Sequence, residues 1–313
     1  MAVHCADYEG AFMDLNPASV LRRHGAKKAI MLLGSLIGRP IAQFLDRIRY
    51  RNAEPYCGPS ADELRQIEAL LVDEGIPVID YMINLEDLKF FQRERPFPAD
   101  YHGGRGGGAW NEKILEHYIA FKLLALAEFN QDIYVDVAAG GSPWAMLLRQ
   151  QGGIQAFALD RAVRSPYNDL SYYKCEDATA TTFADSSVRG ISLQCAYEVF
   201  GANDDIRLLY EIRRILQPGG RAIILPLYMH THYCCYASPE YFGRDFSDTG
   251  AKKYIHWSSR GVRSSRKYDV HQLKKRVLDT ISALGMNYRI FVLRNKKDIA
   301  ADVYCHFILE INK

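Results

Sequence analysis

The apolar positions of this chain follow two periods, and the change of period divides it into two parts. From residue 133 onward, short apolar runs alternate with longer segments in which apolar residues recur every three or four positions. This alternation predicts a parallel β-sheet with helices on both faces, because right-handed crossovers join parallel strands. The expected strands are residues 133–137, 155–159, 170–174, 190–194, 221–227, 288–293 and 303–311, and the clearest helices are residues 111–129, 204–216 and 270–284.

The last two expected strands are joined by a short turn region around residues 295–302. So short a connection favours antiparallel pairing, since a parallel pair needs a crossover of about a dozen residues or more. The sequence therefore predicts an α/β fold whose sheet is mostly parallel and ends in an antiparallel hairpin.

The first hundred residues show helical patterns instead. Ser60-Ala61-Asp62-Glu63 is a capping box, and the helix that it opens carries its apolar residues on one face. A further helical pattern over residues 85–92 ends before Pro96. Five glycines then occupy the six positions 103–108, which predicts a mobile joint because glycine restricts the backbone least. We therefore predict an N-terminal helical unit with a glycine-rich joint over residues 1–109, and a second domain over residues 110–313.

Two features of the N-terminal unit have both a structural and a functional explanation. Residues 27–51 carry an apolar stripe and end in Arg47, Arg49 and Arg51. A pair of core-facing helices is the favoured explanation, and the alternative is an interfacial helix that contacts a membrane surface or a lipid-linked substrate. The glycine-rich joint is either a plain linker or a lid that carries His102 or Trp110 over the second domain.

Composition narrows the class of protein. The 313 residues are 48% hydrophobic and carry a net charge of +2, which favours a globular chain and gives no strong nucleic-acid signal. Seven cysteines without a CxxC motif argue against a disulfide framework and point to a reducing compartment, so a cytoplasmic location is expected. The adjacent Cys234-Cys235 pair is not predicted to bind a metal, and no metal is expected. Whether the chain forms a homodimer is left open.

The most informative turn lies between the strand at 133–137 and the helical pattern that resumes at Ala145. Its residues, Ala138-Ala139-Gly140-Gly141-Ser142, are all small, so the backbone can pass close beneath a ligand. The following helix would point its N-terminal N–H groups at that ligand. Asp160 closes the next strand, at the distance expected for a carboxylate that binds a ribose. The alternative role of Asp160 is to cap the element that follows it.

Further motifs follow in a fixed order: Cys175-Glu176-Asp177-Ala178, the strand at 190–194, and the turn Pro218-Gly219-Gly220 before the strand at 221–227. With the small-residue turn and Asp160, this order resembles the class I S-adenosylmethionine (SAM) dependent methyltransferases. The resemblance covers roughly the C-terminal two-thirds of the chain. It implies a Rossmann-like, seven-stranded, mostly parallel sheet with a C-terminal antiparallel hairpin. It also implies SAM as cofactor and S-adenosyl-L-homocysteine as its product.

The turn departs from the pattern of three glycines that is usual in this family. Ala138 and Ser142 stand at the first and third glycine positions, and only Gly140 is retained. Alanine and serine are the least bulky replacements, so we expect SAM binding to persist. A SAM-binding scaffold protein that has lost catalysis remains an alternative.

The resemblance also implies roles for single residues. Asp136 would orient the turn or the ammonium of SAM, Asp160 would bind the ribose, and Asp177 would meet the adenine, unless it only caps the turn at 179–182. The full expected cofactor set is Asp136, Ala138, Gly140, Ser142, Asp160, Asp177, Ala178 and Gln194. Candidate general bases are His230 and His232, which follow the fifth strand, and Glu198, whose alternative role is hydrogen bonding within its loop.

The acceptor is less defined than the donor. Residues 228–268 are rich in aromatic side chains, and Arg260, Arg263, Arg266 and Lys267 lie within eight positions. Arginine forks suit phosphates and carboxylates, whereas a solvated surface would be the structural explanation. We therefore predict O-methylation of a small-molecule or glycan-like acceptor that bears an anionic group, with N- or C-methylation of a natural-product intermediate as the alternative. The expected acceptor contacts are Tyr197, Tyr233, Arg263 and Arg266.

Overall fold

The computed structural model describes residues 44–105, 109–163, 166–244 and 248–313, which form two compact units. The described part of the smaller unit comes from residues 44–58, 235–244 and 252–265. The larger unit comprises Pro59–Cys234, residues 248–251 and Arg266–Lys313. The boundary therefore lies between Gly58 and Pro59, whereas the sequence suggested one after residue 109.

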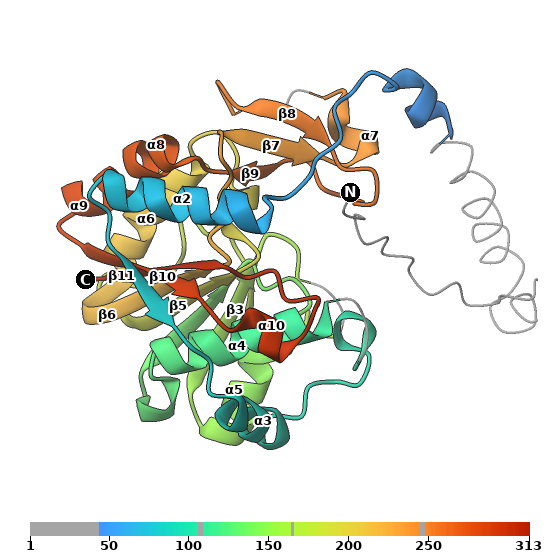
Figure 1. Cartoon of the computed structure of the whole chain (residues 1–313). Helices are drawn as coiled ribbons and strands as arrows, with labels where there is room; N and C mark the ends of the chain where they lie inside the picture. The colour runs from blue at the N-terminus through green and yellow to red at the C-terminus, as the bar shows by residue number, and fades with distance from the viewer. Residues whose placement is uncertain (1–43, 106–108, 164–165, 245–247) are drawn as a thin grey trace, which may run out of the picture. The chain divides into compact units, whose positions relative to one another are not determined.

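An eight-stranded sheet forms the centre of the larger unit (Figure 1). Its spatial order is β1-β10-β11-β6-β5-β2-β3-β4. The strands are β1 (Val78–Tyr81), β2 (Ile133–Val137), β3 (Gln155–Asp160), β4 (Tyr173–Cys175), β5 (Val188–Gln194), β6 (Leu216–Leu225), β10 (Asn287–Leu293) and β11 (Phe307–Asn312).

The predicted fold class is confirmed, with one addition to the sheet. Strands β10 and β11 pair antiparallel, as their short connection indicated, and β11 also runs antiparallel to β6. The eighth strand, β1, pairs parallel to β10 and extends the sheet beyond the seven expected strands. It was missed because only four residues, Val78-Ile79-Asp80-Tyr81, form it, between two clear helical patterns.

Helices cover both faces of this sheet. On one face lie α2 (Ala61–Asp73), α6 (Asp204–Ile215), α8 (Val270–Leu273) and α9 (Asp279–Ala283), and on the other lie α3 (Leu85–Glu94), α4 (Trp110–Leu123) and α5 (Trp144–Gly152) (Figure 1). Each face has its own hydrophobic core: Ile67 and Leu209 belong to the first, Ile114 and Trp144 to the second. The predicted capping box is present, since the Ser60 and Glu63 side chains each accept a hydrogen bond from the other's backbone N–H. Residues 59–109 thus supply α2, β1 and α3 to the larger unit.

The strand order reverses between β2 and β5. The crossover through α5 leads from β2 to β3 on one side, whereas β5 pairs with β2 on the other. In open α/β sheets, ligands bind outside the carboxyl ends of the strands at such a reversal. The topology therefore predicts a ligand site beyond Val137 and Gln194.

The smaller unit contains β8 (Lys252–Ile255), α7 (Pro239–Phe242) and most of β7 (Cys234–Ala237). Strands β8, β7 and β9 (Ser265–Lys267) form a second sheet in that order. Tyr56 packs against Tyr236 at a ring-centroid distance of 4.5 Å, and its N–H donates to Ile255 O at 2.8 Å. Of the expected helical segment 27–51, residues 27–43 lie outside the described residues, and Phe44 and Ile48 are exposed.

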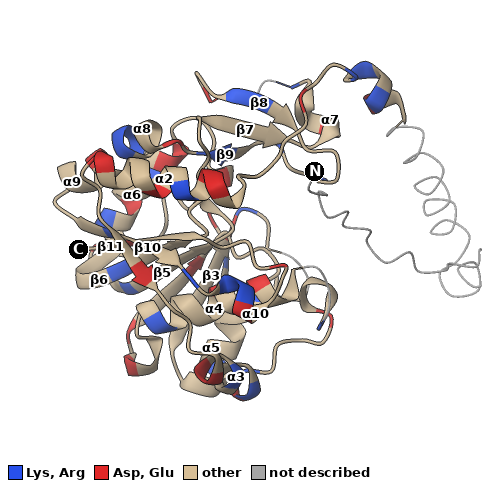
Figure 2. Ribbon diagram, viewed as in Figure 1, with Lys and Arg blue, Asp and Glu red and all other residues tan. Residues whose placement is uncertain are grey.

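Charged residues of both signs are interspersed over the helices of the larger unit (Figure 2). Within the described ranges, no helix combines the length and apolar character that crossing a lipid bilayer requires.

Candidate functional site

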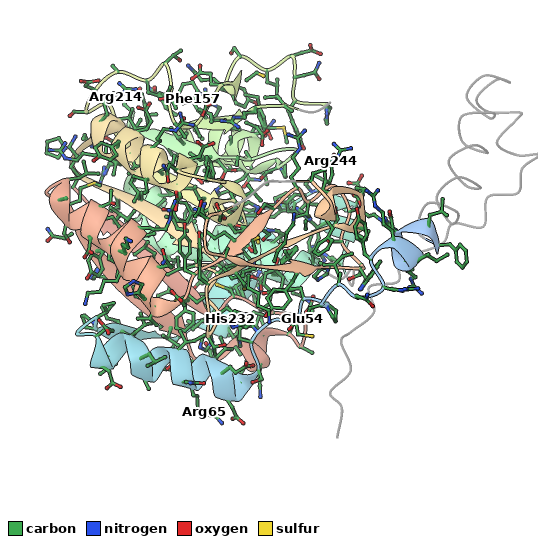
Figure 3. All side chains as sticks on the ribbon, turned by 90° about the horizontal axis from the view of Figure 1, so that it is seen from above. Glu54, Arg65, Phe157, Arg214, His232 and Arg244 are labelled. Carbon is green, nitrogen blue, oxygen red and sulfur yellow. The ribbon has the colours of Figure 1, made fainter. Side chains whose placement is uncertain are left out.

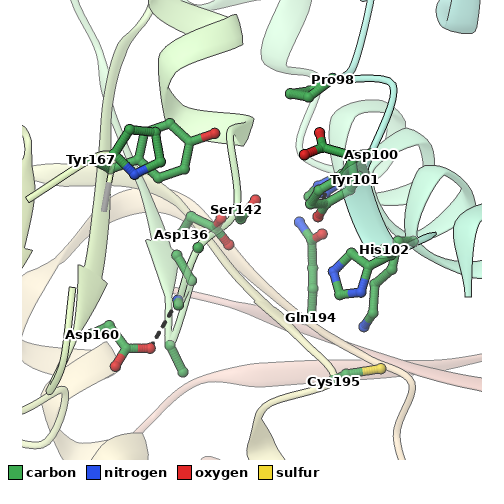
Figure 4. Close-up of a pocket in the computed structure, with 17 residues that line it drawn as sticks. Pro98, Asp100, Tyr101, His102, Asp136, Ser142, Asp160, Tyr167, Gln194 and Cys195 are labelled. Atoms are coloured by element: carbon green, nitrogen blue, oxygen red, sulfur yellow. Dashed lines mark hydrogen bonds between the residues drawn. The ribbon is translucent and has the colours of Figure 1, made fainter. Parts of the chain in front are cut away.

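A cavity of about 740 Å³ opens at the reversal point of the sheet (Figure 4). Asp160 and Tyr167 lie on one side of it, and Pro98, Tyr101 and His102 lie on the opposite side. Every described residue of its lining belongs to the larger unit, and its size falls within the range of small-molecule sites. The described lining is Pro98, Asp100, Tyr101, His102, Lys113, His117, Asp136, Ala138, Ala139, Gly140, Gly141, Ser142, Asp160, Pro166, Tyr167, Gln194 and Cys195.

The floor of the cavity is the small-residue turn after β2. Ala138 and Gly140 both have φ of 56°, in the left-handed region, so the turn requires at Ala138 a conformation that glycine adopts more easily. The N–H of Gly140 donates to Asp160 Oδ2 at 2.9 Å, and Ala139 N–H donates to Leu159 O at 3.1 Å. These two bonds fix the turn to the end of β3. Replacing the usual glycine by Ala138 therefore strains the turn without abolishing it.

Asp160 lies between two cavities. It lines the large one and also a second cavity of about 180 Å³, to which Leu159, Ala178 and Phe200 contribute apolar walls. Besides the bond to Gly140, its Oδ1 accepts a hydrogen bond from Ala162 N–H at 2.9 Å. A carboxylate held between an apolar slot and a polar cavity fits a ribose with adenine on one side and a polar tail on the other.

Asp177 does not lie with this set. Its carboxylate accepts hydrogen bonds from Thr179 N–H at 2.9 Å and from Thr179 Oγ1 at 2.8 Å, and it pairs with Arg161 at 2.6 Å. The hydrogen bond from the Thr179 N–H holds the pKa of Asp177 below its usual value. The structure thus favours the turn-capping role over adenine contact. Neighbouring Glu176 and Ala178 line the smaller cavity instead.

Asp136 is the buried carboxylate of the cavity, with 2% of its surface exposed. Burial raises its pKa to about 7, and a hydrogen bond from Ser192 Oγ at 3.4 Å only partly offsets this. Ser192 also accepts from Gln194 Nε2 at 3.1 Å and contacts Tyr134 OH at 2.5 Å. This buried network fixes Asp136 where a ligand ammonium would stabilise its charged form.

The wall opposite the turn comes from residues 98–102 together with Lys113 and His117. The sequence did not predict it, apart from the alternative that His102 belongs to a lid. Tyr101 OH lies 2.9 Å from His117 Nε2, and the His117 ring stacks on Phe97 at 5.0 Å. His117 Nδ1 and Gln194 Oε1 are buried without a hydrogen-bond partner among the described residues. Because buried polar atoms are normally satisfied by protein or water, both atoms are available to hydrogen bond a ligand in the cavity or each other's side chain. Only the glycine-rich joint next to this wall offered a signal in the sequence.

Behind this wall lies a buried polar cluster. Glu116 accepts from Lys113 Nζ at 2.9 Å and from Cys195 Sγ at 2.9 Å, and Cys195 Sγ lies 3.2 Å from both Tyr228 OH and Tyr304 OH. Burial alone would lower the pKa of Lys113, but the Glu116 carboxylate outweighs burial and raises it. Lys113 and Cys195 line the cavity, so this cluster reaches it.

The three predicted bases lie elsewhere: none of His230, His232 and Glu198 is among the described residues that line the cavity. Glu198 lies in the 3₁₀ turn η3 (Tyr197–Val199), where burial raises its pKa and its Oε2 is buried with no hydrogen-bond partner in the described chain. Glu198 therefore has an unpartnered carboxylate oxygen but no place in the described lining of the cavity. The two histidines follow β6 and are considered below.

Two of the expected acceptor contacts are core residues. Tyr197 is 2% exposed, and its OH donates to Asp205 O at 3.3 Å. Arg266 is fully buried, and its five N–H groups are all used. They donate to Asp248 Oδ2 at 2.8 Å, Tyr268 OH at 2.9 Å, Ala202 O at 2.9 Å, and the carboxylates of Asp205 and Asp248. The expectation that Arg266 contacts the acceptor does not fit this arrangement, because three buried anionic or polar side chains already satisfy it.

Tyr233 and Arg263 complete the expected acceptor set. Tyr233 is buried beside Tyr268 at a ring-centroid distance of 6.3 Å, outside the described lining of the cavity. Arg263 belongs to the smaller unit, is exposed, and lies over the Tyr241 ring at 5.8 Å. Of these four residues, only Arg263 has an exposed side chain.

A reversal-point cavity above a small-residue turn defines an α/β domain that binds a nucleotide-like cofactor. Residues 135–224 match the family model described as a methyltransferase domain. The chain therefore carries a class I SAM-dependent methyltransferase domain. SAM is the cofactor of this family. The protein is a SAM-dependent methyltransferase (EC 2.1.1.-). Asp136 and Asp160 line the large cavity, and Asp160 and Ala178 line the smaller one; their contacts to SAM remain predictions.

Solved structures with similar folds are methyltransferases of low sequence identity. The 1,6-didemethyltoxoflavin-N1-methyltransferase of Burkholderia thailandensis, solved with that substrate and S-adenosylhomocysteine, is 12% identical, with 83% of this chain and 93% of that chain covered at a TM-score of 0.43. A SAM-dependent methyltransferase from Mesorhizobium loti is 14% identical (63% and 98% covered, TM-score 0.43). One from Archaeoglobus fulgidus is 10% identical (72% and 99% covered, TM-score 0.40). No curated protein matches the chain in sequence.

Proposed function

We propose that this methyltransferase acts on an oxygen atom of a small-molecule or glycan-like acceptor that carries an anionic group. The observation that supports this proposal most is the polar wall opposite the cofactor turn. That wall offers a charged ammonium, Lys113, together with the two unpartnered buried atoms His117 Nδ1 and Gln194 Oε1. A ligand with a hydroxyl and a negative charge would satisfy all three groups.

Lys113 is the group we assign to the acceptor's anion. An ammonium carries three N–H groups, and Lys113 donates one of them to Glu116. Cys195 is a second neighbour of this ammonium, which leaves one N–H group for an acceptor in the cavity that Lys113 lines. Arg263, an exposed residue of the smaller unit, stays a separate candidate contact for the acceptor's anion.

A hydroxyl acceptor must lose its proton as SAM supplies the electrophilic methyl group. His117 is neutral because burial lowers its pKa well below the usual value. If its Nε2 carries the hydrogen toward Tyr101 OH, Nδ1 is free to accept a proton or hydrogen bond from the acceptor. Glu198 remains a second candidate base, because its Oε2 has no hydrogen-bond partner in the described chain and could accept a proton. Amines need less assistance, so dependence on a base distinguishes oxygen from nitrogen acceptors.

The test uses matched acceptors that differ by one group. Sugars and phenols with and without a carboxylate, and their amino counterparts, are incubated with SAM that carries an isotope-labelled methyl group, and products are identified by mass spectrometry. We expect methyl ethers of the anionic hydroxyl compounds. Methylation of only the amino compounds would contradict the oxygen assignment, and SAM binding without turnover of any acceptor would favour the scaffold alternative.

Lys113→Met separates the acceptor's charge from the cofactor. We expect the KM for an anionic acceptor to rise at least tenfold, about 1.4 kcal/mol, while the Kd for SAM changes less than twofold. Lys113→Met/Glu116→Gln gives the same test without a lone buried carboxylate. Lys122→Met, on the exposed side of the same helix, is the matched control. An equal change in both constants would mean that Lys113 supports the whole cavity rather than the acceptor's anion.

A further inference from the structure

A second group of chemically active side chains lies outside the cofactor cavity, in the segment that follows β6. His230, His232 and Cys234 each offer one possible ligand atom, and these three atoms lie within 4.8 Å of one another. His230 and Cys234 are buried and His232 is half-buried (His232 is labelled in Figure 3). All three residues belong to the larger unit.

The local backbone brings the segment after β6 beside residue 268. His230 N–H donates to Tyr268 O at 2.8 Å and Tyr268 N–H donates to Tyr228 O at 3.1 Å, around an isolated bridge between Met229 and Tyr268. The chain then bends at Thr231 and His232 before β7 begins at Cys234. The three candidate ligand atoms therefore converge across a bend.

We propose that His230, His232 and Cys234 bind a divalent metal ion, and that the ion is zinc. Two imidazoles and a thiolate are ligands typical of zinc, with bonds of about 2.0–2.1 Å to nitrogen and 2.3 Å to sulfur. Tetrahedral geometry with these bonds spaces the ligand atoms about 3.3–3.6 Å apart. From within 4.8 Å, small side-chain rotations suffice to reach this spacing. A fourth position remains for water or a carboxylate.

Groups around the cluster fit a bound cation. Thr231 Oγ1 lies 3.2 Å from His230 Nδ1 and 3.3 Å from His232 Nδ1. Metal-binding histidines commonly donate their second ring nitrogen to such an oxygen, which fixes the ring orientation.

The proposed ion has a structural role. None of its three ligands is among the described residues that line the cofactor cavity. Cross-linking these three residues would hold the bend after β6 in one conformation. The proposal does not depend on the acceptor chemistry proposed above. It gives His230 and His232 a role other than that of general base.

Metal content and cobalt spectroscopy test the site on the untagged, full-length protein. After growth with zinc and dialysis, we expect one zinc per chain by mass spectrometry of the metal. After exchange with Co²⁺, a thiolate-to-cobalt charge-transfer band should appear in the near ultraviolet. Zinc-free protein should have a lower Tm that added Zn²⁺ restores, because binding to the folded state alone stabilises it.

Variants assign the ligands. Cys234→Ser should abolish the cobalt charge-transfer band, and His232→Asn should lower zinc affinity at least a hundredfold, while SAM binding is retained. Cys175→Ser and His271→Asn change exposed residues of the same types and should leave metal content at one per chain.

Two results would overturn the proposal. One is wild-type protein that neither retains zinc nor shows the thiolate band with Co²⁺, a result that does not depend on whether any variant folds. The other is a zinc content that Cys234→Ser and His232→Asn leave unchanged. Loss of methyl transfer with intact zinc binding would instead count only against the proposed function.

Discussion

The two ends of the cofactor cavity differ in how the chain builds them. At the end that we assign to SAM, the lining comes from consecutive strand–helix units, from Asp136 through the turn to Asp160 and Ala178. At the end that we assign to the acceptor, it comes from segments far apart in sequence, such as Tyr101, Lys113 and Cys195. The sequence singled out most residues of the first end, though not with Asp177 among the lining, and few residues of the second.

The difference follows from sheet geometry. Successive parallel strands place their carboxyl ends at one edge of the sheet, so motifs that follow each strand must meet. No comparable rule brings a segment preceding the first core strand of this site to the same edge. Substitutions at the cofactor end, which the fold constrains, should therefore strongly reduce SAM affinity. Substitutions at the acceptor end, which separate segments build, should change the KM for the acceptor without changing SAM affinity.

The largest expected effect lies at the turn. Ala138→Leu should reduce SAM affinity more than a hundredfold, because a bulky side chain at φ of 56° would strain the turn and fill both cavities that Ala138 lines. Calorimetry measures the affinity, and circular dichroism checks the fold. Ala138→Gly is the control: it should bind SAM at least as well as the parent, since glycine adopts this φ readily. A leucine variant with parental affinity would place the cofactor elsewhere.

At the ribose position, Asp160→Ala should weaken SAM by about 1.5–3 kcal/mol, the range for hydrogen bonds to a charged group. This corresponds to a Kd about 10–150 times higher. Asp160→Asn keeps an oxygen for the Gly140 N–H and should lose less. Titration calorimetry on both variants separates two contributions of Asp160: its hydrogen bond to the Gly140 N–H in the turn, and its binding of the ribose. Equal, small losses would remove Asp160 from the cofactor contacts.

The pH dependence of SAM binding tests Asp136. Burial raises the pKa of this carboxyl to about 7, and a ligand ammonium favours the charged form. SAM affinity should therefore rise with pH as Asp136 loses its proton, by about tenfold between pH 6 and pH 8. Asp136→Asn should bind more weakly and lack this part of the pH dependence. A wild-type affinity that falls with pH over this range would contradict the assigned contact.

The smallest effect is expected at the exposed arginine. Arg263→Gln should raise the KM for an anionic acceptor by at most about fivefold, because exposed charge pairs contribute about 0.2–1 kcal/mol. The effect should shrink with added salt, and SAM affinity should not change. Steady-state kinetics at two ionic strengths provide the measurement. An effect larger than that of Lys113→Met would move the main anion contact from the cavity to Arg263.

The basic cluster in the sequence shows where local reasoning reached its limit. Arg260, Arg263 and Arg266 look equivalent as a run of cations, yet Arg266 is buried and Arg263 is exposed. What separates them is the pair of carboxylates Asp205 and Asp248, which meet the Arg266 guanidinium from 61 and 18 positions earlier in the chain. Partners so distant leave no trace in the local pattern of charges.

The sequence by itself determined the α/β class, the antiparallel hairpin of β10 and β11, the small-residue turn and the position of Asp160. Each depends on periodicity, on a short connection or on the next strand, all of which are local. Only the tertiary structure decided that β1 extends the sheet, that His117 and Lys113 line the same cavity as the small-residue turn, and that His230, His232 and Cys234 converge. Those outcomes depend on which distant segments pack together, because burial and shared cavities are properties of the whole fold rather than of neighbouring residues.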